Sequence, residues 1–198
     1  MRALDVDPVH DTRETFRALL DAASRPGTVE RTPVAPAVNA VVATLVDHEV
    51  TVHGGSETLR AALDRERRLS RAPFEEADLI VAAGDTDGRV TDAERGTLKE
   101  PSEGATVIYE VDALAADATR VNGLALSVTG PGVPGTRTFG VGGLPATEVG
   151  AIAEAQSTYP RGVDVFLVDE ERVAALPRSV EVEVEIDDGV GDRTAEVA

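Results

Sequence analysis

The chain has 198 residues, 42% of them hydrophobic, which is enough to bury one compact core. It has no cysteine, which excludes disulfides, thiolate nucleophiles and cysteine metal sites. With 36 acidic and 19 basic residues, its net charge of −17 argues against nucleic-acid binding, because contacts to phosphates need a basic face.

The composition also indicates that the protein works in concentrated salt. Lys99 is the only lysine, so arginine supplies the other basic residues. An acidic, lysine-poor surface is typical of proteins that work in concentrated salt, where strong screening weakens self-repulsion, so we expect a halophilic source. No apolar run is long enough to span a membrane, and residues 1–11 lack the apolar centre of a secretory signal. We therefore expect a cytoplasmic protein without membrane contact.

The first third of the chain predicts three helices. Glu14 follows Asp11 at capping-box spacing, and the helix behind them has one apolar stripe of Phe16, Leu19, Leu20 and Ala23. Arg25-Pro26-Gly27 ends this helix. Next we expect a strand at 28–32, a helix from Pro36 to about residue 46, a strand at 50–53 and a helix capped by Ser56 to about residue 69.

The rest of the chain is dominated by strand patterns. We predict strands at 78–83, 106–111 and 124–129, a helix over about 146–158, and strands at 163–168, 173–176 and 180–186. The last strand alternates valine and glutamate as an exposed edge does. Because helices and strands interleave, we predict a single α/β domain over residues 1–186, with three layers, a mixed open sheet and helices on both faces. Residues 187–198 are predicted to be an acidic disordered tail.

Standard catalytic signatures are missing. The chain has no P-loop and no Gly-x-Ser-x-Gly motif. A dinucleotide site at Gly140 to Gly143 is disfavoured because the segment follows no long strand and the downstream ribose-binding acid is unconvincing. His48 and His53 are better interpreted as exposed histidines than as metal ligands, so we predict no metal. Lys99 lies in a polar segment, whereas Schiff-base chemistry needs a desolvated lysine. Catalytic residues therefore stay unassigned.

One polar element is a candidate anion site. The glycines of segment 130–135, Gly130 and Gly132 among them, can expose backbone N–H groups, and Arg137 follows directly. Arg17 and Arg178 are further candidates for binding substrate. A rigid turn between two strands is the simpler interpretation of the segment. The arginines then pair with carboxylates or with another subunit.

Four segments in this order resemble the PhnH family of the carbon–phosphorus lyase system. They are Phe16-Arg17-x-Leu19-Leu20-x-Ala22-x-Ser24-x-Pro26-Gly27; Gly96-Thr97 with Pro101-x-x-Gly104-Ala105-Thr106; Leu124-x-Leu126-x-x-Thr129-Gly130-x-Gly132 with Arg137; and Pro160-x-Gly162-Val163-Asp164 with Leu176-Pro177-Arg178 and a terminal Val-Glu-Val. Each segment is weak alone, but their order and spacing cover residues 12 to 184. The resemblance implies a fold similar to the main domain of PLP-dependent transferases, without PLP or any other cofactor.

The resemblance also implies partners and a process. It implies a homodimer that joins the other core subunits of the lyase. In that system a phosphonate displaces adenine from ATP and gives a ribose 1-phosphonate 5-triphosphate. The substitution is attributed to a companion subunit, so this chain is expected to be a non-catalytic or co-catalytic subunit of alpha-D-ribose 1-methylphosphonate 5-triphosphate synthase. A stand-alone transferase and a regulatory protein that binds phosphonate or nucleotide are the alternatives, and direct contact with phosphonate or ATP is left open.

Overall fold

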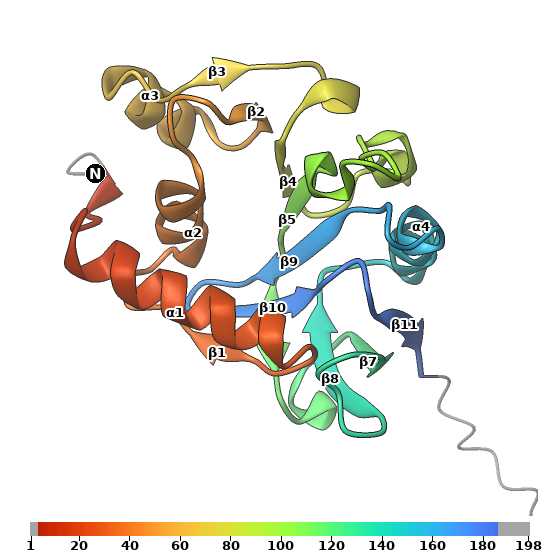
Figure 1. Ribbon diagram of the computed structural model, residues 1–198. Helices are drawn as coiled ribbons and strands as arrows, with labels where there is room; N and C mark the ends of the chain where they lie inside the picture. The colour runs from red at the N-terminus through yellow and green to blue at the C-terminus, as the bar shows by residue number, and fades with distance from the viewer. Residues whose placement is uncertain (1–3, 186–198) are drawn as a thin grey trace, which may run out of the picture.

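The computed structural model describes residues 4–185, which form an α/β fold with four α-helices (Figure 1). The helices are α1 (His10–Ser24), α2 (Ala37–Leu45), α3 (Glu57–Arg65) and α4 (Ala146–Gln156). The strands are β1 (Glu30–Arg31), β2 (Thr51–Gly54), β3 (Ser70–Arg71), β4 (Leu79–Ala83), β5 (Thr106–Glu110), β6 (Ala113–Ala115), β7 (Leu124–Thr129), β8 (Arg137–Gly142), β9 (Asp164–Val168), β10 (Arg172–Leu176) and β11 (Glu181–Val184). The predicted tail, residues 187–198, lies outside the described residues.

The main sheet is mixed, as predicted, and has seven strands in the order β1-β10-β9-β5-β4-β2-β3. Strands β9, β5, β4, β2 and β3 run parallel, whereas β10 is antiparallel to β9 and β1 is antiparallel to β10. The central parallel strands β4, β5 and β9 are rich in apolar residues because both faces of the sheet are covered there.

The expectation of a single sheet is wrong. Strands β11, β7, β8 and β6 form a separate antiparallel sheet in that order, so the strand predicted at 180–186 ends this second sheet instead of the main one. The segment between β7 and β8 is too short for a crossover connection, which forces them into a hairpin. The predicted edge position of the Val-Glu strand is confirmed, since within residues 4–185 β11 pairs with β7 alone.

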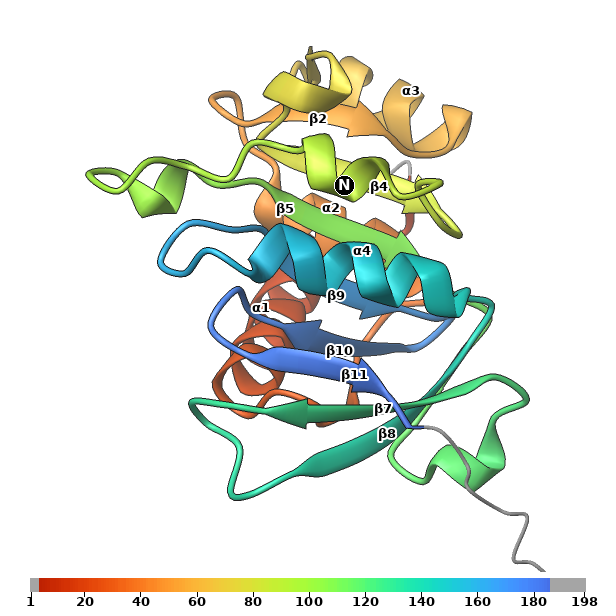
Figure 2. The same cartoon turned by 90° about the vertical axis from the view of Figure 1, so that its right-hand side faces the viewer.

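Figure 2 shows helices on both sides of the main sheet, and a hydrophobic core covers each of its two faces. Alternate residues of the central strands face α1, α2 and α3, among them Leu79, Val81 and Ile108. The residues between them face α4 and the second sheet, including Ile80, Val107 and Tyr109. The layers are thus three helices, the main sheet, and α4 together with the second sheet, which agrees with helices on both faces.

The start of α1 differs from the prediction. The helix begins at His10, and Asp7 supplies the cap, with its Oδ1 accepting from the backbone N–H of Val9 (2.8 Å) and His10 (2.7 Å). Asp11 lies inside the first turn and accepts from the N–H of Asp7 at 2.8 Å instead of beginning a capping box. These N–H donors stabilise the ionised carboxylate and lower the pKa of Asp7.

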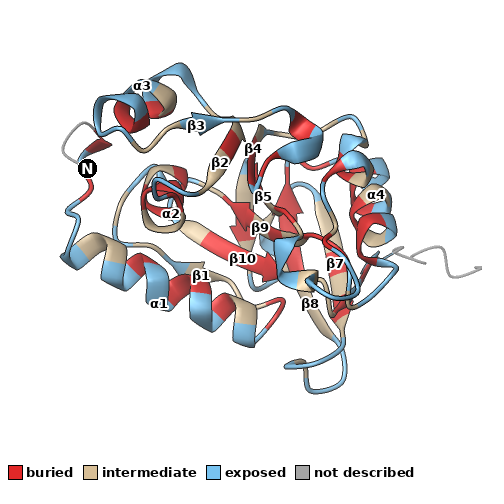
Figure 3. Cartoon of the chain, turned by 45° about the horizontal axis from the view of Figure 1, so that its top comes forward, coloured by how far each residue is buried: buried red, intermediate tan, exposed pale blue. Residues whose placement is uncertain are grey.

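The predicted apolar stripe of α1 is split between core and solvent. Leu19 is 3% exposed, whereas Phe16 and Leu20 are 55% and 57% exposed, and Thr15 and Ala22 take buried positions beside Leu19. Figure 3 shows buried and exposed stretches alternating along α1. The helix is therefore rotated relative to the predicted face. Two large apolar side chains lie on its outer surface.

The helix α3 begins as predicted and ends earlier. Ser56 Oγ accepts from the N–H of Leu59 at 3.1 Å, which confirms the cap. The helix ends at Arg65, and Arg67 has a left-handed backbone conformation (φ 58°) that turns the chain into β3. Arg68 lies beyond the end of the helix and donates to the carbonyls of Ala43 and Val46 at the end of α2.

Candidate functional site

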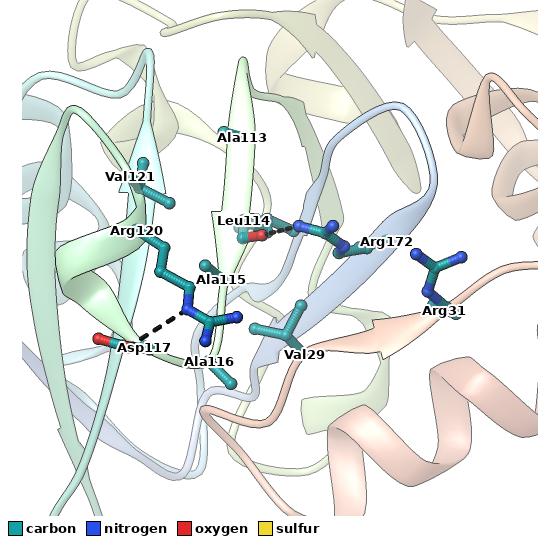
Figure 4. A pocket seen from close by; sticks show the side chains of 10 residues that line it. All are labelled: Val29, Arg31, Ala113, Leu114, Ala115, Ala116, Asp117, Arg120, Val121 and Arg172. Carbon is teal, nitrogen blue, oxygen red and sulfur yellow. Dashed lines mark hydrogen bonds and ion pairs between the residues drawn. The ribbon is translucent and has the colours of Figure 1, made fainter.

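A hollow of about 700 Å³ lies at the carboxyl ends of β5 and β9, where the main sheet meets β6 of the second sheet (Figure 4). In α/β folds ligands bind outside the carboxyl ends of the parallel strands. Three arginines from distant parts of the chain line it, and Asp117 is its only acidic lining residue. The lining also includes apolar side chains: Val29, Ala113, Leu114, Ala115, Ala116 and Val121. A net positive lining stands out in a chain of net charge −17.

Arg31 and Arg172 enter the hollow from neighbouring strands. They are direct partners in the antiparallel register of β1 and β10, so their side chains leave the same face of the sheet. Residues paired in this way have Cβ atoms about 4.5–5.5 Å apart, and like charges there are destabilising. Each arginine has a carboxylate of its own nearby, with Arg31 Nη1 3.4 Å from Glu171 Oε2 and Arg172 Nη1 3.8 Å from Asp169 Oδ2.

Asp169 lies behind the hollow and holds the backbone around Arg172 in place. Its carboxylate is 8% exposed and accepts from the N–H groups of Leu114 (2.8 Å), Glu171 (2.9 Å) and Arg172 (2.8 Å). The Arg172 guanidinium then donates from Nη1 to the carbonyl of Leu114. These bonds tie β6 to the turn between β9 and β10, so the position of Arg172 is set before any ligand arrives.

Arg120 reaches the hollow from the other side, on the 3-10 helix η5 (Ala118–Arg120). Asp117 caps η5 by accepting from Thr119 Oγ1 (2.7 Å) and Thr119 N–H (3.1 Å), and these two bonds lower the pKa of its carboxyl. Arg120 Nε lies 3.5 Å from Asp117 Oδ2, and its side chain is 79% exposed. Gly140 makes room for η5, because a Cβ there would lie 2.9 Å from Cα of Ala118. The glycine-rich stretch at 140–143 thus has a packing role.

The predicted anion segment packs against the protein on both sides. Arg137 Nη1 donates to the carbonyls of Pro26 (2.7 Å) and Arg25 (3.2 Å) at the end of α1. A Cβ on Gly132 would lie 2.5 Å from the carbonyl oxygen of Ser24, and one on Gly130 would lie 3.1 Å from that of Ser179. The anion segment and Arg137 therefore contact two other family-like segments, one at the end of α1 and one at the turn before β11.

Arg178 and Arg17 have different surroundings. The Arg178 side chain is 13% exposed and donates to Asp164 Oδ2 from Nη2 (2.5 Å) and Nε (3.1 Å), and also to the carbonyls of Pro101 and Gly104. Asp164 is the first residue of β9, and its half-buried carboxylate is paired with Arg178. Arg17 is exposed on α1 and has no hydrogen bond or ion pair within residues 4–185. The three predicted arginines do not share one pocket.

The arginines of the hollow were missed by sequence reasoning because no motif joins them. Arg31, Arg120 and Arg172 come from β1, η5 and β10, and each is an isolated basic residue in the sequence. The sequence signal that could have indicated two of these arginines is a short-range spacing. Asp117 with Arg120 and Asp169 with Arg172 each place an acid three residues before an arginine, next to a strand.

A separate buried polar network lies on the face of β5 that packs against α4. Glu148, at 1% exposure, accepts from Tyr109 Oη (2.7 Å), Thr86 Oγ1 (2.5 Å) and the N–H of Gly88 (2.9 Å). Burial, and then the nearby carboxylate, raise the pKa of Tyr109 far above its usual value. The bonds join α4 to the loop after β4, and this loop crosses the carboxyl end of that strand.

Within residues 4–185 no group of three histidine, cysteine, aspartate or glutamate side chains is placed to hold a metal ion. His53 instead packs edge-on against Phe74, with ring centres 5.4 Å apart, and its Nδ1 lies 3.2 Å from the carbonyl oxygen of Ala72. In the same range, no helix has the length and apolar character needed to cross a membrane.

Comparison with known proteins covers almost the entire described fold. A family model described as "Bacterial phosphonate metabolism protein (PhnH)" matches residues 5–183. The chain is 28% identical to the "Alpha-D-ribose 1-methylphosphonate 5-triphosphate synthase subunit PhnH" of Rhizobium meliloti (strain 1021), over 90% of this chain and 94% of that protein. It is 30% identical to the "Putative C-P lyase subunit protein HtxG" of Stutzerimonas stutzeri, over 84% and 83%. The resemblance drawn from the four segments is thereby confirmed, and the chain belongs to the PhnH family of bacterial phosphonate metabolism proteins.

Proposed function

We propose that this chain is a subunit of the carbon–phosphorus lyase machinery, required for forming ribose 1-phosphonate 5-triphosphate from ATP and a phosphonate. The observation that carries the proposal is the extent of the match. The synthase subunit of Rhizobium meliloti aligns over 90% of this chain and 94% of its own length, so the shared part is the whole folded unit.

The side-chain geometry supports a role that needs other subunits. Within residues 4–185, Glu148 is enclosed by three donors, and Lys99 is 89% exposed, 3.6 Å from Glu100. Neither arrangement provides a nucleophile held by a base and an orienting group. The outer face of α1 carries exposed Phe16 and Leu20 beside exposed Arg17, a combination that is common at protein contacts. We assign this face to contact with another subunit.

Further parts of the proposal rest on the family resemblance. They are a homodimer of the free chain and a fold similar to the main domain of PLP-dependent transferases without PLP. The proposed halophilic source rests instead on the acidic, lysine-poor composition, and the proposed cytoplasmic address on the sequence pattern. Arg17, Arg137, Arg178, Gly130 and Gly132 remain proposed as binding residues. The bonds of Arg137 and Arg178 to backbone carbonyls favour a structural role for those two.

The test combines genetics with purification. We expect deletion of the gene to abolish growth of the native source on methylphosphonate as sole phosphorus source, while growth on phosphate is unchanged. The tagged chain purified in molar KCl is expected to carry the other lyase subunits. Normal growth of the deletion strain on methylphosphonate would refute the proposal.

One observation favours a second candidate function. The arginine-lined hollow suits a stand-alone protein that binds a small anion and regulates another process. This alternative predicts that the tagged chain purifies without lyase subunits and still binds the anion.

A further inference from the structure

We propose that the arginine-lined hollow binds the triphosphate of a ribose 5-triphosphate, with the ribose end against its apolar wall. The proposal rests on the proposed function, since the relative from Rhizobium meliloti is named for a product of this class. It assigns the binding to residues of this chain, namely Arg31, Arg120 and Arg172.

The charge arrangement is the first argument. Arg31 and Arg172 are placed side by side across β1 and β10, and Arg120 faces them across the hollow (Figure 4). Holding like charges together has an electrostatic cost, and an anion bound between them relieves it. Guanidinium groups are suited to this because their planar N–H donors match phosphate oxygens in pairs.

The existing ion pairs do not block such a ligand. The Arg31 and Arg120 side chains are 74% and 79% exposed, and neither donates a hydrogen bond within residues 4–185. Exposed ion pairs contribute little to stability, so exchanging Glu171 or Asp117 for a phosphate has little cost. Arg172 is different, since its bond to the carbonyl of Leu114 fixes it as a pre-oriented donor.

Size and wall chemistry indicate more than inorganic phosphate. A volume of about 700 Å³ lies within the range of about 300–1,000 Å³ that is usual for small-molecule sites. Val29, Leu114 and Val121 line the same space as the arginines. An inorganic anion has no apolar surface to place against these side chains. A nucleoside triphosphate has a triphosphate for the arginines and a ribose end for the apolar wall.

The experiment is calorimetric titration of the purified full chain in KCl, without divalent cations, using ATP and inorganic tripolyphosphate as probes. We expect saturable binding of ATP that is tighter than binding of tripolyphosphate. Arg31→Gln and Arg120→Gln are each expected to weaken ATP binding roughly ten-fold, the value of one charge-assisted hydrogen bond. Both residues are exposed, so these variants should fold, and circular dichroism checks this.

Arg161→Gln is the matched control. Arg161 is an exposed arginine at the opposite end of β9, and its substitution should leave ATP binding unchanged. Absence of saturable ATP binding by the wild-type chain would overturn the proposal. Equal weakening in all three variants would reduce the effect to general charge and overturn it as well, and equal affinity for tripolyphosphate and ATP would overturn the assignment of a ribose triphosphate.

A parallel purification separates this proposal from the one on which it rests. If lyase subunits co-purify with the tagged chain but ATP binding does not depend on Arg31 and Arg120, the hollow is wrongly assigned and the subunit role stands. If ATP binds through these arginines but no lyase subunit co-purifies, the hollow stands and the subunit role fails.

Discussion

Arg178→Ala removes a guanidinium that joins two family-like segments. The side chain donates twice to Asp164 Oδ2 and also to the carbonyls of Pro101 and Gly104. After truncation the Asp164 carboxylate loses its charged partner and both carbonyls lose a donor. The truncation should therefore loosen the loop before β5, which Arg178 holds against the start of β9.

The magnitude follows from burial. Removing one partner of a buried ion pair costs about 3–5 kcal/mol. The Asp164 side chain is 35% exposed, so water replaces part of the lost bonding, and we expect a loss of about 2–3 kcal/mol in the free energy of unfolding. For a chain of this size each kcal/mol lowers the melting temperature by about 2–4 °C, which gives a decrease of about 4–12 °C.

The assay is thermal and urea unfolding followed by circular dichroism in 1 M KCl, for Arg178→Ala, Asp164→Asn and the double variant. Because the two residues share one interaction, the double variant should lose less than the sum of the single losses. Arg161→Ala is the control, as this nearby arginine is exposed. An Arg178→Ala protein with unchanged stability and lost ATP or phosphonate binding would refute the structural role and restore Arg178 as a substrate-binding residue.

Four further outcomes are expected. Between 0.1 M and 1 M KCl the melting temperature should rise, because the Debye length falls from about 10 Å to about 3 Å and screens a net charge of −17; an unchanged value would contradict the halophilic interpretation. Tyr109, whose pKa is raised by burial and Glu148, stabilises the fold fully below pH of about 10, and this contribution is lost as the pH rises towards its folded-state pKa. Urea unfolding from pH 8 to 11 should therefore show a decline that is smaller in Tyr109→Phe, and equal declines would count against the network. PLP should form no borohydride-reducible adduct at Lys99, which is 89% exposed; a visible absorbance band that is abolished in Lys99→Ala would show the opposite. Light scattering of the free chain in 1 M KCl should give a dimer mass, and a monomer mass at micromolar concentration would contradict the homodimer.

Local signals in the sequence determined much of the backbone. The Ser56 cap, the proline and glycine after α1 and the apolar runs of β4, β5 and β9 each depend on residues close in the chain, so their positions were predictable. The family was recognisable for a related reason. The four segments occur in the order that the resemblance requires, and Arg137 and Arg178 hold several of them together.

The assignment of strands to sheets required the tertiary structure. Alternation in β7 and β11 shows that each strand has one buried face, but it does not identify the layer that this face contacts. The same limit applies to α1, where Leu19 and Leu20 are equally apolar in the sequence, and only packing against α2 and β10 decides that Leu20 stays outside.

The candidate site depended on the tertiary structure most of all. Arg31 and Arg172 become neighbours only through the pairing of β1 with β10, and Arg120 joins them only because η5 packs over Gly140. Their separate positions in the sequence carry no such information, since an isolated arginine in an acidic chain usually pairs with the nearest carboxylate. The net charge of the chain follows from its composition alone. The gathering of positive charge in one hollow depends on the register of β1 and β10, which places Arg31 beside Arg172.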